Sequence, residues 1–315
     1  MKKFKKVLLG ILAVLLAIVA TACSNSKKSN SANSKNYTPK SLTIQFVPSQ
    51  AANKLEARAK PLEKMLSKRL GIPVKVTMST DYNTVVEAMK SKKVDVGFLP
   101  PDGYVLAHKE GAADLLLQAQ RYGVKQPNGQ ATTKLVNSYR AEILVKKGSK
   151  IKSWKDLKGK SISVQNPTSS AGYVFPIAEL AQKGLDVPKD CKLVTVTGHD
   201  QAVLNVLNGD TDAAFVFEDA RNSVKADQPN IMKEVVPIYF TKPIPNDTIS
   251  VIPNMSKSFQ KKLAKAFIAI SKSKEGKKLI ESIYSHEGYT YAKDSDFNIV
   301  RKYDKIVENV GTSKK

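Results

Sequence analysis

The chain has 315 residues, with 51 Lys and Arg against 28 Asp and Glu and a formal net charge of +23. This length allows two lobes or domains, and the charge raises the question of a nucleic-acid partner. The lysines are spread along every segment without an aromatic-interleaved basic block, so we predict no nucleic-acid partner and expect an exported protein at an anionic envelope surface.

The first 22 residues have the pattern of a bacterial secretory signal. Four lysines precede an apolar run at 7–20, and small residues then precede Cys23. Small residues before a cysteine resemble the lipobox, in which that cysteine is lipidated and becomes the mature N-terminus. An uncleaved membrane anchor is the alternative, although the apolar run is short for a span.

We therefore predict a signal peptide at 1–22, a lipidated Cys23, and a flexible tether that extends to residue 39 and is rich in Ser, Asn and Lys. The protein is expected to be anchored by this lipid to the outer face of the cytoplasmic membrane. Cys191 is the only other cysteine, which leaves no pair for an intramolecular disulfide framework.

Strand-like and helix-like patterns alternate through the first half of the remaining chain. The expected elements are a strand at 42–47, a helix at 51–70 closed by Gly71, a strand at 74–78, a helix at 84–90 and a strand at 94–99. This alternation predicts an α/β fold with parallel sheets flanked by helices. An apolar strand at 141–145 is expected to carry the chain into a second lobe.

The segment 166–172, Asn-Pro-Thr-Ser-Ser-Ala-Gly, lies between a predicted strand at 160–164 and a predicted helix at 173–184. A helix N-terminus at this point offers unpaired N–H groups and the positive end of the helix dipole. The serine hydroxyls add donors, and the small residues allow close approach, so the segment suits a small oxyanion. A serine N-cap without a ligand is the alternative. Pro176 predicts an irregular first turn.

An internal repeat indicates two similar lobes. Each copy has an aromatic residue at a helix start, an aspartate 13 residues later and another after seven more: Tyr82, Asp95 and Asp102, then His199, Asp212 and Asp219. Open α/β sheets bind ligands at the carboxyl ends of their strands, which places these residues at a cleft between the lobes. Chance similarity of two amphipathic units is the alternative.

The C-terminal part of the chain is expected to return to the first lobe. Two prolines in the loop 241–247 restrict its backbone, as in a crossing between lobes. Apolar faces at 259–270 and 276–284 predict helices that pack on the first lobe. The predicted division is therefore 40–140 plus 248–310 for lobe 1 and 141–247 for lobe 2.

From Leu42 to Tyr284 the chain resembles the substrate-binding lipoproteins of phosphate, phosphite and phosphonate ABC importers. The landmarks are Asp81-Tyr82, Val94-Asp95-Val96-Gly97-Phe98, the Pro167-to-Gly172 loop followed by Pro176, Gly198-His199, and Pro245-Asn246-Asp247. The resemblance implies a two-lobed periplasmic-binding-protein fold of type II, an ABC permease as partner, a monomer, and neither cofactor nor catalytic activity.

The resemblance also implies a ligand site, although the sequence does not decide which phosphorus compound it prefers. Its expected residues are Ser169 and Ser170 for the oxyanion, His199 and Tyr82 completing that shell, Tyr139 lining the cleft, and Asp219 and Asp247 on the far side of the ligand. Family members often have a hydroxyl where Ala171 stands, so one donor is missing. Whether Glu218 or Asp219 faces the ligand is left open, and Arg221 is expected to face solvent.

Carboxylates beside an oxyanion make sense if the ligand keeps a proton or carries an ammonium group, because a carboxylate only accepts hydrogen bonds. Three alternatives to a phosphorus-oxyanion binding protein stay open. One is a protein of the same fold for another anion such as a sulfonate, and another is a surface adhesin or sensor with a vestigial cleft. The third is a Ser-dependent hydrolase, although no Gly-x-Ser-x-Gly elbow is present. No His-Glu-x-x-His metal motif is present either.

Overall fold

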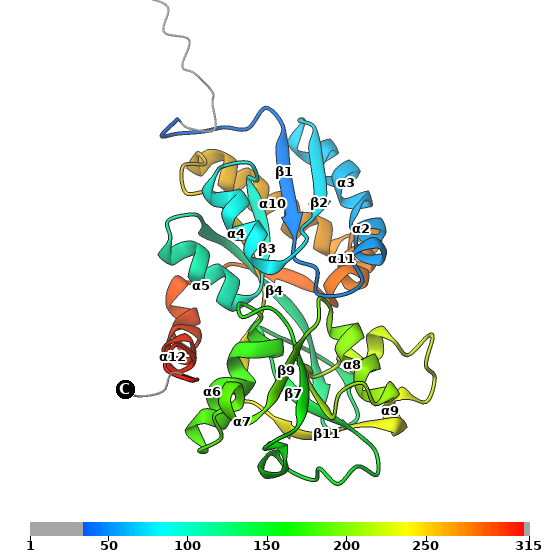
Figure 1. Cartoon of the computed structure of the whole chain (residues 1–315). Coiled ribbons are helices and arrows are strands. Elements are labelled where there is room, and N and C mark those ends of the chain that lie inside the picture. The colour runs from blue at the N-terminus through cyan, green and yellow to red at the C-terminus, as the bar shows by residue number, and fades with distance from the viewer. Residues whose placement is uncertain (1–33, 312–315) are drawn as a thin grey trace, which may run out of the picture.

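The computed structural model describes residues 34–311, which form two lobes joined by crossing segments (Figure 1). The predicted signal peptide, Cys23 and most of the predicted tether lie outside the described residues. Within residues 34–311, no helix combines the length and the apolar character needed to cross a bilayer.

The first lobe is built on a seven-stranded sheet of order β14-β4-β13-β3-β1-β2, in which β5 also pairs with β4. Its N-terminal elements are β1 (Leu42–Phe46), α2 (Ala52–Ala59), α3 (Pro61–Leu70), β2 (Val74–Met78), α4 (Tyr82–Lys90), β3 (Val96–Leu99), α5 (Pro101–Lys109), β4 (Asp114–Lys125) and β5 (Gln130–Val136). After the second lobe the chain returns as β13 (Thr248–Val251), α10 (Lys257–Lys272), α11 (Lys274–Tyr284) and β14 (Gly288–Thr290).

The second lobe is built on a five-stranded sheet of order β11-β7-β10-β8-β9. Its elements are β7 (Ala141–Lys146), a 3-10 turn (Trp154–Leu157), β8 (Ser161–Val164), a π turn (Ser170–Val174), α6 (Phe175–Gln182), α7 (Val187–Asp190), β9 (Lys192–Thr195), α8 (His199–Asn208), β10 (Ala213–Phe217), a 3-10 turn (Ala220–Ser223), α9 (Ile231–Glu234) and β11 (Val235–Phe240). Successive β10 side chains alternate between two apolar cores, Phe215 in one and Ala214 and Val216 in the other. Burial on both faces explains why this strand reads as a continuous apolar run.

Both sheets are mixed, whereas the sequence predicted parallel sheets. β1 pairs in parallel with β2 and β3, and β8 pairs in parallel with β9 and β10. One strand in each sheet pairs antiparallel with this parallel set: β13 pairs with β3 in the first sheet, and β7 pairs with β10 in the second. Each of these strands enters its lobe directly from a crossing, next to the paired strands β6 (Ser138–Tyr139) and β12 (Ile244–Pro245). A strand that enters from the cleft runs away from it, and is therefore antiparallel to strands that end there.

The internal repeat predicted from the sequence is present as a shared local structure. Asp95 Oδ2 accepts hydrogen bonds from Thr43 N and Oγ1 at 2.8 and 2.7 Å, at the start of β1. Asp212 Oδ2 accepts from Ser161 N and Oγ at 2.9 Å each, at the start of β8. The two aspartates 13 residues after a helix start therefore bind the corresponding strand in each lobe.

Three local predictions differ from the structure. The predicted helix at 51–70 is two helices, because Pro61 has no N–H and begins α3 as its first residue. The predicted tether ends before residue 39, since Tyr37 is buried and its N–H donates to Asn254 O at 2.8 Å. The prediction that Arg221 faces solvent is wrong. Arg221 is fully buried, and its guanidinium contacts Val235 O at 3.1 Å and Glu142 Oε2 at 3.4 Å.

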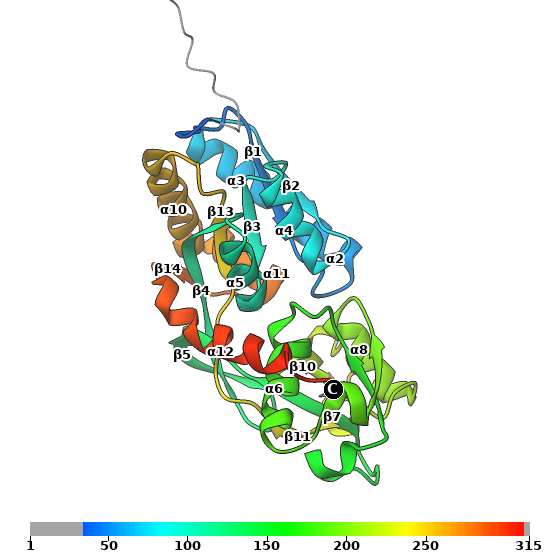
Figure 2. The ribbon, with the colours of Figure 1, turned by 60° about the vertical axis from the view of Figure 1, so that its left-hand side comes forward.

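The last helix, α12 (Asn298–Val307), contacts both lobes. It packs against α5 of the first lobe and α6 of the second (Figures 1 and 2). Val300 and Tyr303 on this helix are buried, and the Tyr303 ring lies 4.5 Å from the Phe175 ring of α6. The sequence division assigned residues up to 310 to the first lobe, whereas this helix lies across the boundary.

Candidate functional site

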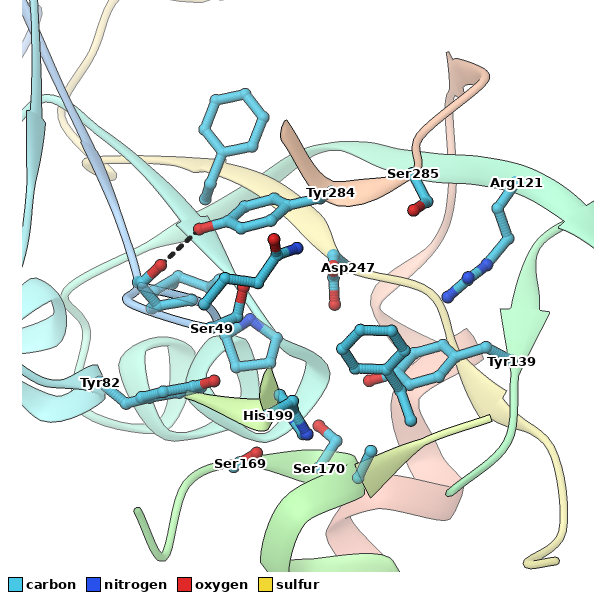
Figure 3. Close-up of a pocket in the computed structure, with 17 residues that line it drawn as sticks. Ser49, Tyr82, Arg121, Tyr139, Ser169, Ser170, His199, Asp247, Tyr284 and Ser285 are labelled. Carbon is cyan, nitrogen blue, oxygen red and sulfur yellow. Dashed lines mark hydrogen bonds between the residues drawn. The ribbon is translucent and has the colours of Figure 1, made fainter. Parts of the chain in front are cut away.

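A cavity of about 60 Å³ lies between the two lobes, where the strands β1, β3, β8 and β10 end (Figure 3). At roughly 10–15 Å³ for a water molecule, this volume holds a few waters or one small tetrahedral ion. The cavity is lined by Val47, Ser49, Gln50, Tyr82, Phe98, Leu99, Pro100, Arg121, Tyr139, Ser169, Ser170, Ala171, His199, Phe217, Asp247, Tyr284 and Ser285. Six of the seven ligand residues expected from the sequence are in this set.

Helix starts surround the cavity. α4 begins at Tyr82, α5 at Pro101, the π turn before α6 at Ser170, and α8 at His199. These starts follow from the βα connections, since each helix begins just beyond the carboxyl end of a strand. The positive ends of the helix dipoles therefore point to the cavity without placing a formal charge in it.

Ser169 and Ser170 lie at the first turn of this π segment. Ser169 Oγ accepts the N–H of Gly172 at 3.2 Å, and Ser170 Oγ accepts the N–H of Asp102 at 3.2 Å. A serine hydroxyl that accepts from the backbone can still donate its own hydrogen to a ligand. Ser169 is thus an N-cap and also a lining residue, and the two interpretations of this segment are compatible.

The π turn confirms that the helix start is irregular. Val174 N–H donates to Ser169 O at 3.1 Å, a five-residue step, and Pro176 follows in the first turn of α6. A Cβ atom at Gly172 would lie 1.6 Å from Gln165 Oε1, so no other residue fits there without displacing the buried Gln165. This close packing fixes the loop that carries the two serines.

Tyr82, at the start of α4 in the first lobe, and Tyr139, in the crossing strand β6, are phenol donors at the cavity. Both are buried, and burial raises the pKa of each phenol well above its ordinary value. The phenols therefore stay protonated at neutral pH, and each can donate a hydrogen bond to an anion.

His199 is buried and neutral. Burial lowers the pKa of its imidazole to about 3. Its ring packs edge-on against Phe217 with centroids 4.8 Å apart, and its Nδ1 has no hydrogen-bond partner among residues 34–311. A neutral imidazole can donate from one ring nitrogen and accept at the other, so His199 adds a polar group without adding a cation.

Arg121 on β4 is the only cation among the lining residues in the described chain, and sequence reasoning missed it. Its Nη2 lies 2.5 Å from both carboxylate oxygens of Asp219, with side chains that are 7% and 13% exposed. Asp219, which was expected to contact the ligand, is not a lining residue; its carboxylate faces Arg121. Glu218 does not line the cavity either, because it accepts from Gln126 Nε2 and Arg140 N, each at 3.1 Å.

Asp247 is the lining carboxylate. It directly precedes β13, and its carbonyl accepts the N–H of Ala119 on β4 at 2.8 Å, which places it with the first sheet. Its Oδ2 lies 3.2 Å from Nε2 of the buried His286. The side chain is 26% exposed and faces the cavity (Figure 3).

The lobes touch around the cavity. Hydrogen bonds cross from the first lobe to the second between Ser49 O and His199 N at 2.9 Å, Ala51 N and Asp200 Oδ2 at 3.0 Å, and Asn83 Oδ1 and Thr168 Oγ1 at 3.0 Å. This is a closed arrangement, in which residues from both lobes reach one small volume. No group of three or more His, Cys, Asp or Glu side chains in the described chain is placed to hold a metal ion.

Several lining residues were not predicted from the sequence. Tyr284, at the end of α11, donates to Val47 O at 2.5 Å and so joins two distant parts of the first lobe. Arg121 lies in a strand that the sequence analysis did not identify. The repeat pattern could have directed attention to residues after β1, such as Ser49 and Gln50, because their counterparts after β8 include the two serines.

A family model for the periplasmic substrate-binding protein of phosphonate ABC transporters matches residues 44–297. The chain is 32% identical over 213 residues to the phosphate-import protein PhnD of Mycolicibacterium smegmatis, covering 65% of this chain and 64% of that protein. The match thus spans less than two thirds of that relative. The chain is 24% identical over 253 residues to the phosphonates-binding periplasmic protein of Escherichia coli, covering 78% and 70% respectively.

Two solved structures share the arrangement of the lobes. PhnD1 from Prochlorococcus marinus in complex with methylphosphonate has a TM-score of 0.73 at 17% identity, covering 87% of this chain and 100% of that one. A binding protein component of an ABC phosphonate transporter from Pseudomonas aeruginosa has a TM-score of 0.73 at 19% identity, covering 87% and 90%. At these identities the likeness establishes the fold, and the predicted two-lobed periplasmic-binding-protein fold of type II is confirmed.

Proposed function

On the premise that the chain belongs to the family of periplasmic substrate-binding proteins of phosphonate ABC transporters, we propose that it captures a small phosphorus oxyanion between its lobes. It then delivers the ion to the permease subunits of an ABC importer, which requires the contacts between the lobes to break. The family serves transport and not catalysis, so the Ser-dependent hydrolase is set aside.

The observation that carries this proposal is the set of donors around the cavity. Ser169, Ser170, Tyr82 and Tyr139 each offer a hydroxyl to one volume of about 60 Å³, and His199 adds a neutral imidazole. The helix starts contribute partial positive charge from several directions. A small tetrahedral anion fits this volume and can accept from donors of both lobes at once.

The charges near the cavity favour an anion that keeps a proton. Arg121 is paired with Asp219, and Asp247 adds a further carboxylate, so the local formal charge is negative. A fully deprotonated oxyanion would meet the Asp247 carboxylate as a second acceptor, with no hydrogen between them. Phosphate, phosphite and methylphosphonate carry an acidic proton near neutral pH and can donate it to Asp247, whereas sulfate cannot.

Calorimetric titration and thermal unfolding with phosphate, phosphite, methylphosphonate and sulfate test this function. A true ligand at a hundred times its Kd adds about 2.7 kcal/mol to the free energy of unfolding. We expect at least one phosphorus anion to bind and sulfate to bind far more weakly. Sulfate binding as tight as that of every phosphorus anion would contradict the role of Asp247, and would favour a same-fold protein for another anion.

The location proposed for the protein is the outer face of the cytoplasmic membrane, held by lipid on Cys23. The signal pattern and the Ala-Thr-Ala-Cys sequence support it. The Cys23→Ser variant is expected to be shed into the medium or left unprocessed, as fractionation and mass measurement would detect. A mature Cys23→Ser protein that stays on the membrane would contradict the lipid anchor.

A further inference from the structure

We propose that this cleft selects phosphorus oxyanions without an ammonium group, because Arg121 occupies the carboxylate of Asp219 that would otherwise hold one. The inference rests on the proposed function and narrows its substrate class. It separates small unsubstituted anions such as methylphosphonate from zwitterionic aminoalkylphosphonates.

The first support is the geometry of the pair. Both oxygens of Asp219 contact one guanidinium nitrogen of Arg121, and Arg121 lines the cavity whereas Asp219 does not, so an ammonium group that approaches from the cavity meets the guanidinium before this carboxylate. Arg121 is held in place by the rings of Tyr139 and Phe217, whose centroids lie 5.6 and 6.0 Å from its central carbon. Such a buried, stacked guanidinium is costly to move.

The second support is that other nearby carboxylates are also engaged. Glu218 accepts from Gln126 and Arg140, and the fully buried Glu142 faces Arg221. Asp247 is the one carboxylate that lines the cavity within the described chain, and its negative charge acts on the guanidinium of Arg121, which lines the same cavity (Figure 3). An ammonium group placed at Asp247 would therefore lie beside another cation.

The third support is the charge state of Arg121. Burial alone would lower the pKa of its guanidinium, but the negative charges of Asp219, Glu218 and Asp247 outweigh burial and raise that pKa. The group stays charged, and its buried Nε has no hydrogen-bond partner among residues 34–311. A cation with a spare N–H suits an oxygen of an anion and repels an ammonium group.

The test compares ligands of equal size that differ in charge. 2-Aminoethylphosphonate and n-propylphosphonate have the same number of heavy atoms, so the ratio of their dissociation constants isolates the ammonium group. On the full-length mature protein we expect calorimetry to show methylphosphonate binding tightest, and 2-aminoethylphosphonate binding at least about tenfold more weakly than propylphosphonate, or about 1.4 kcal/mol.

Two variants move this ratio in opposite directions. Arg121→Ala frees the Asp219 carboxylate and is expected to shift the ratio at least tenfold toward 2-aminoethylphosphonate. Asp219→Asn leaves Arg121 unpaired, and is expected to shift it further toward the uncharged analogue. If either variant fails to fold, the ratio measured on the unmodified protein still decides the matter.

The outcomes separate this inference from the proposed function. Failure of every phosphorus compound to bind overturns both. Binding of methylphosphonate together with equal or tighter binding of 2-aminoethylphosphonate overturns the inference alone. Equal exclusion of propylphosphonate and 2-aminoethylphosphonate also overturns it, because size and not charge would then be the cause.

Discussion

The two lobes repeat one topology but contribute different chemistry to the cleft. Strand order, strand direction and the aspartate bound to the first strand correspond between β2-β1-β3-β13-β4 and β9-β8-β10-β7-β11. The second lobe places Ser169, Ser170 and His199 at the cavity, all neutral. Both formally charged lining residues, Arg121 and Asp247, belong to the first sheet or its edge.

This difference shows how one scaffold can bind an oxyanion and also select among different oxyanions. Neutral donors on helix starts stabilise an oxyanion without requiring a countercharge. Charged groups on the facing lobe respond to what else the ligand carries, such as a proton or an ammonium group. We therefore assign affinity for the oxyanion to the neutral donors, of which Ser169, Ser170 and His199 belong to the second lobe, and selectivity among oxyanions to the charged groups of the first lobe.

The largest expected effect is loss of affinity when both serines of the second lobe are removed. On the proposed function each hydroxyl donates one hydrogen bond to the bound anion, worth about 1.5–3 kcal/mol, so we expect Ser169→Ala or Ser170→Ala to raise Kd roughly 10- to 150-fold. The double variant should lose about the sum of the two. Calorimetric titration with the ligand found in the screen measures both changes.

Ser273 provides the matched control for that prediction. It caps α11 far from the cavity, and its Oγ accepts the N–H of Gly276 at 3.1 Å, much as Ser169 accepts that of Gly172. Ser273→Ala should cost about 1 kcal/mol of folding stability and leave Kd unchanged. If Ser169→Ala behaves in the same way, Ser169 is a cap without a ligand role.

A medium effect is expected from the neutral histidine of the second lobe. The pKa of His199 is about 3 in the folded protein, against 6.5 for a histidine in the unfolded chain. As the pH falls, the unfolded chain therefore takes up a proton first, and acid lowers the free energy of unfolding. Between pH 7 and pH 5 this loss is about 2 kcal/mol for the ligand-free protein. His199→Gln should remove that part of the pH dependence, as denaturant unfolding at the two pH values would show.

Identical pH dependence of the unmodified and His199→Gln proteins would contradict the buried neutral state. Other titrating groups are common to both proteins and cancel in the difference. Ligand affinity does not affect this measurement, because it uses the ligand-free protein.

The smallest expected effect is that of removing Asp212, one of the two aspartates that the lobes share. Asp95 is buried, so Asp95→Ala leaves the half-buried N–H and hydroxyl of Thr43 without this partner and should cost about 1–3 kcal/mol of stability. Asp212 is exposed, so water replaces it and Asp212→Ala should cost less than about 1 kcal/mol. Equal costs measured by denaturant unfolding would show that the repeat is alike in energy as well as in geometry.

Much of the fold was predictable, because repeats, apolar periodicity and glycine stops are local signals. The two serines and His199 were found for the same reason: they stand at strand-to-helix junctions. Arg121 was missed since its strand was not identified from the sequence, and only the tertiary structure brings Asp219 of the other lobe against it. Arg221 was misjudged because its burial depends on Glu142, which is distant in the sequence.

The direction of β7 and β13 was unpredictable for a related reason. An apolar run fixes a strand but not its orientation, which here follows from the point where the chain crosses between lobes. Asp219 illustrates the limit for the site. The repeat placed it at the correct end of β10, but whether its carboxylate meets a ligand or a guanidinium depends on a residue of the other lobe.

The most direct measurement is a crystal structure of the protein with bound methylphosphonate. We predict that the phosphonate lies in the cavity between the lobes, with its oxygens within hydrogen-bond distance of the Ser169 and Ser170 hydroxyls and one oxygen facing Asp247. The Arg121–Asp219 pair should be intact beside it. A phosphonate bound elsewhere, or held in this cavity without contact to either serine, would contradict the central claim.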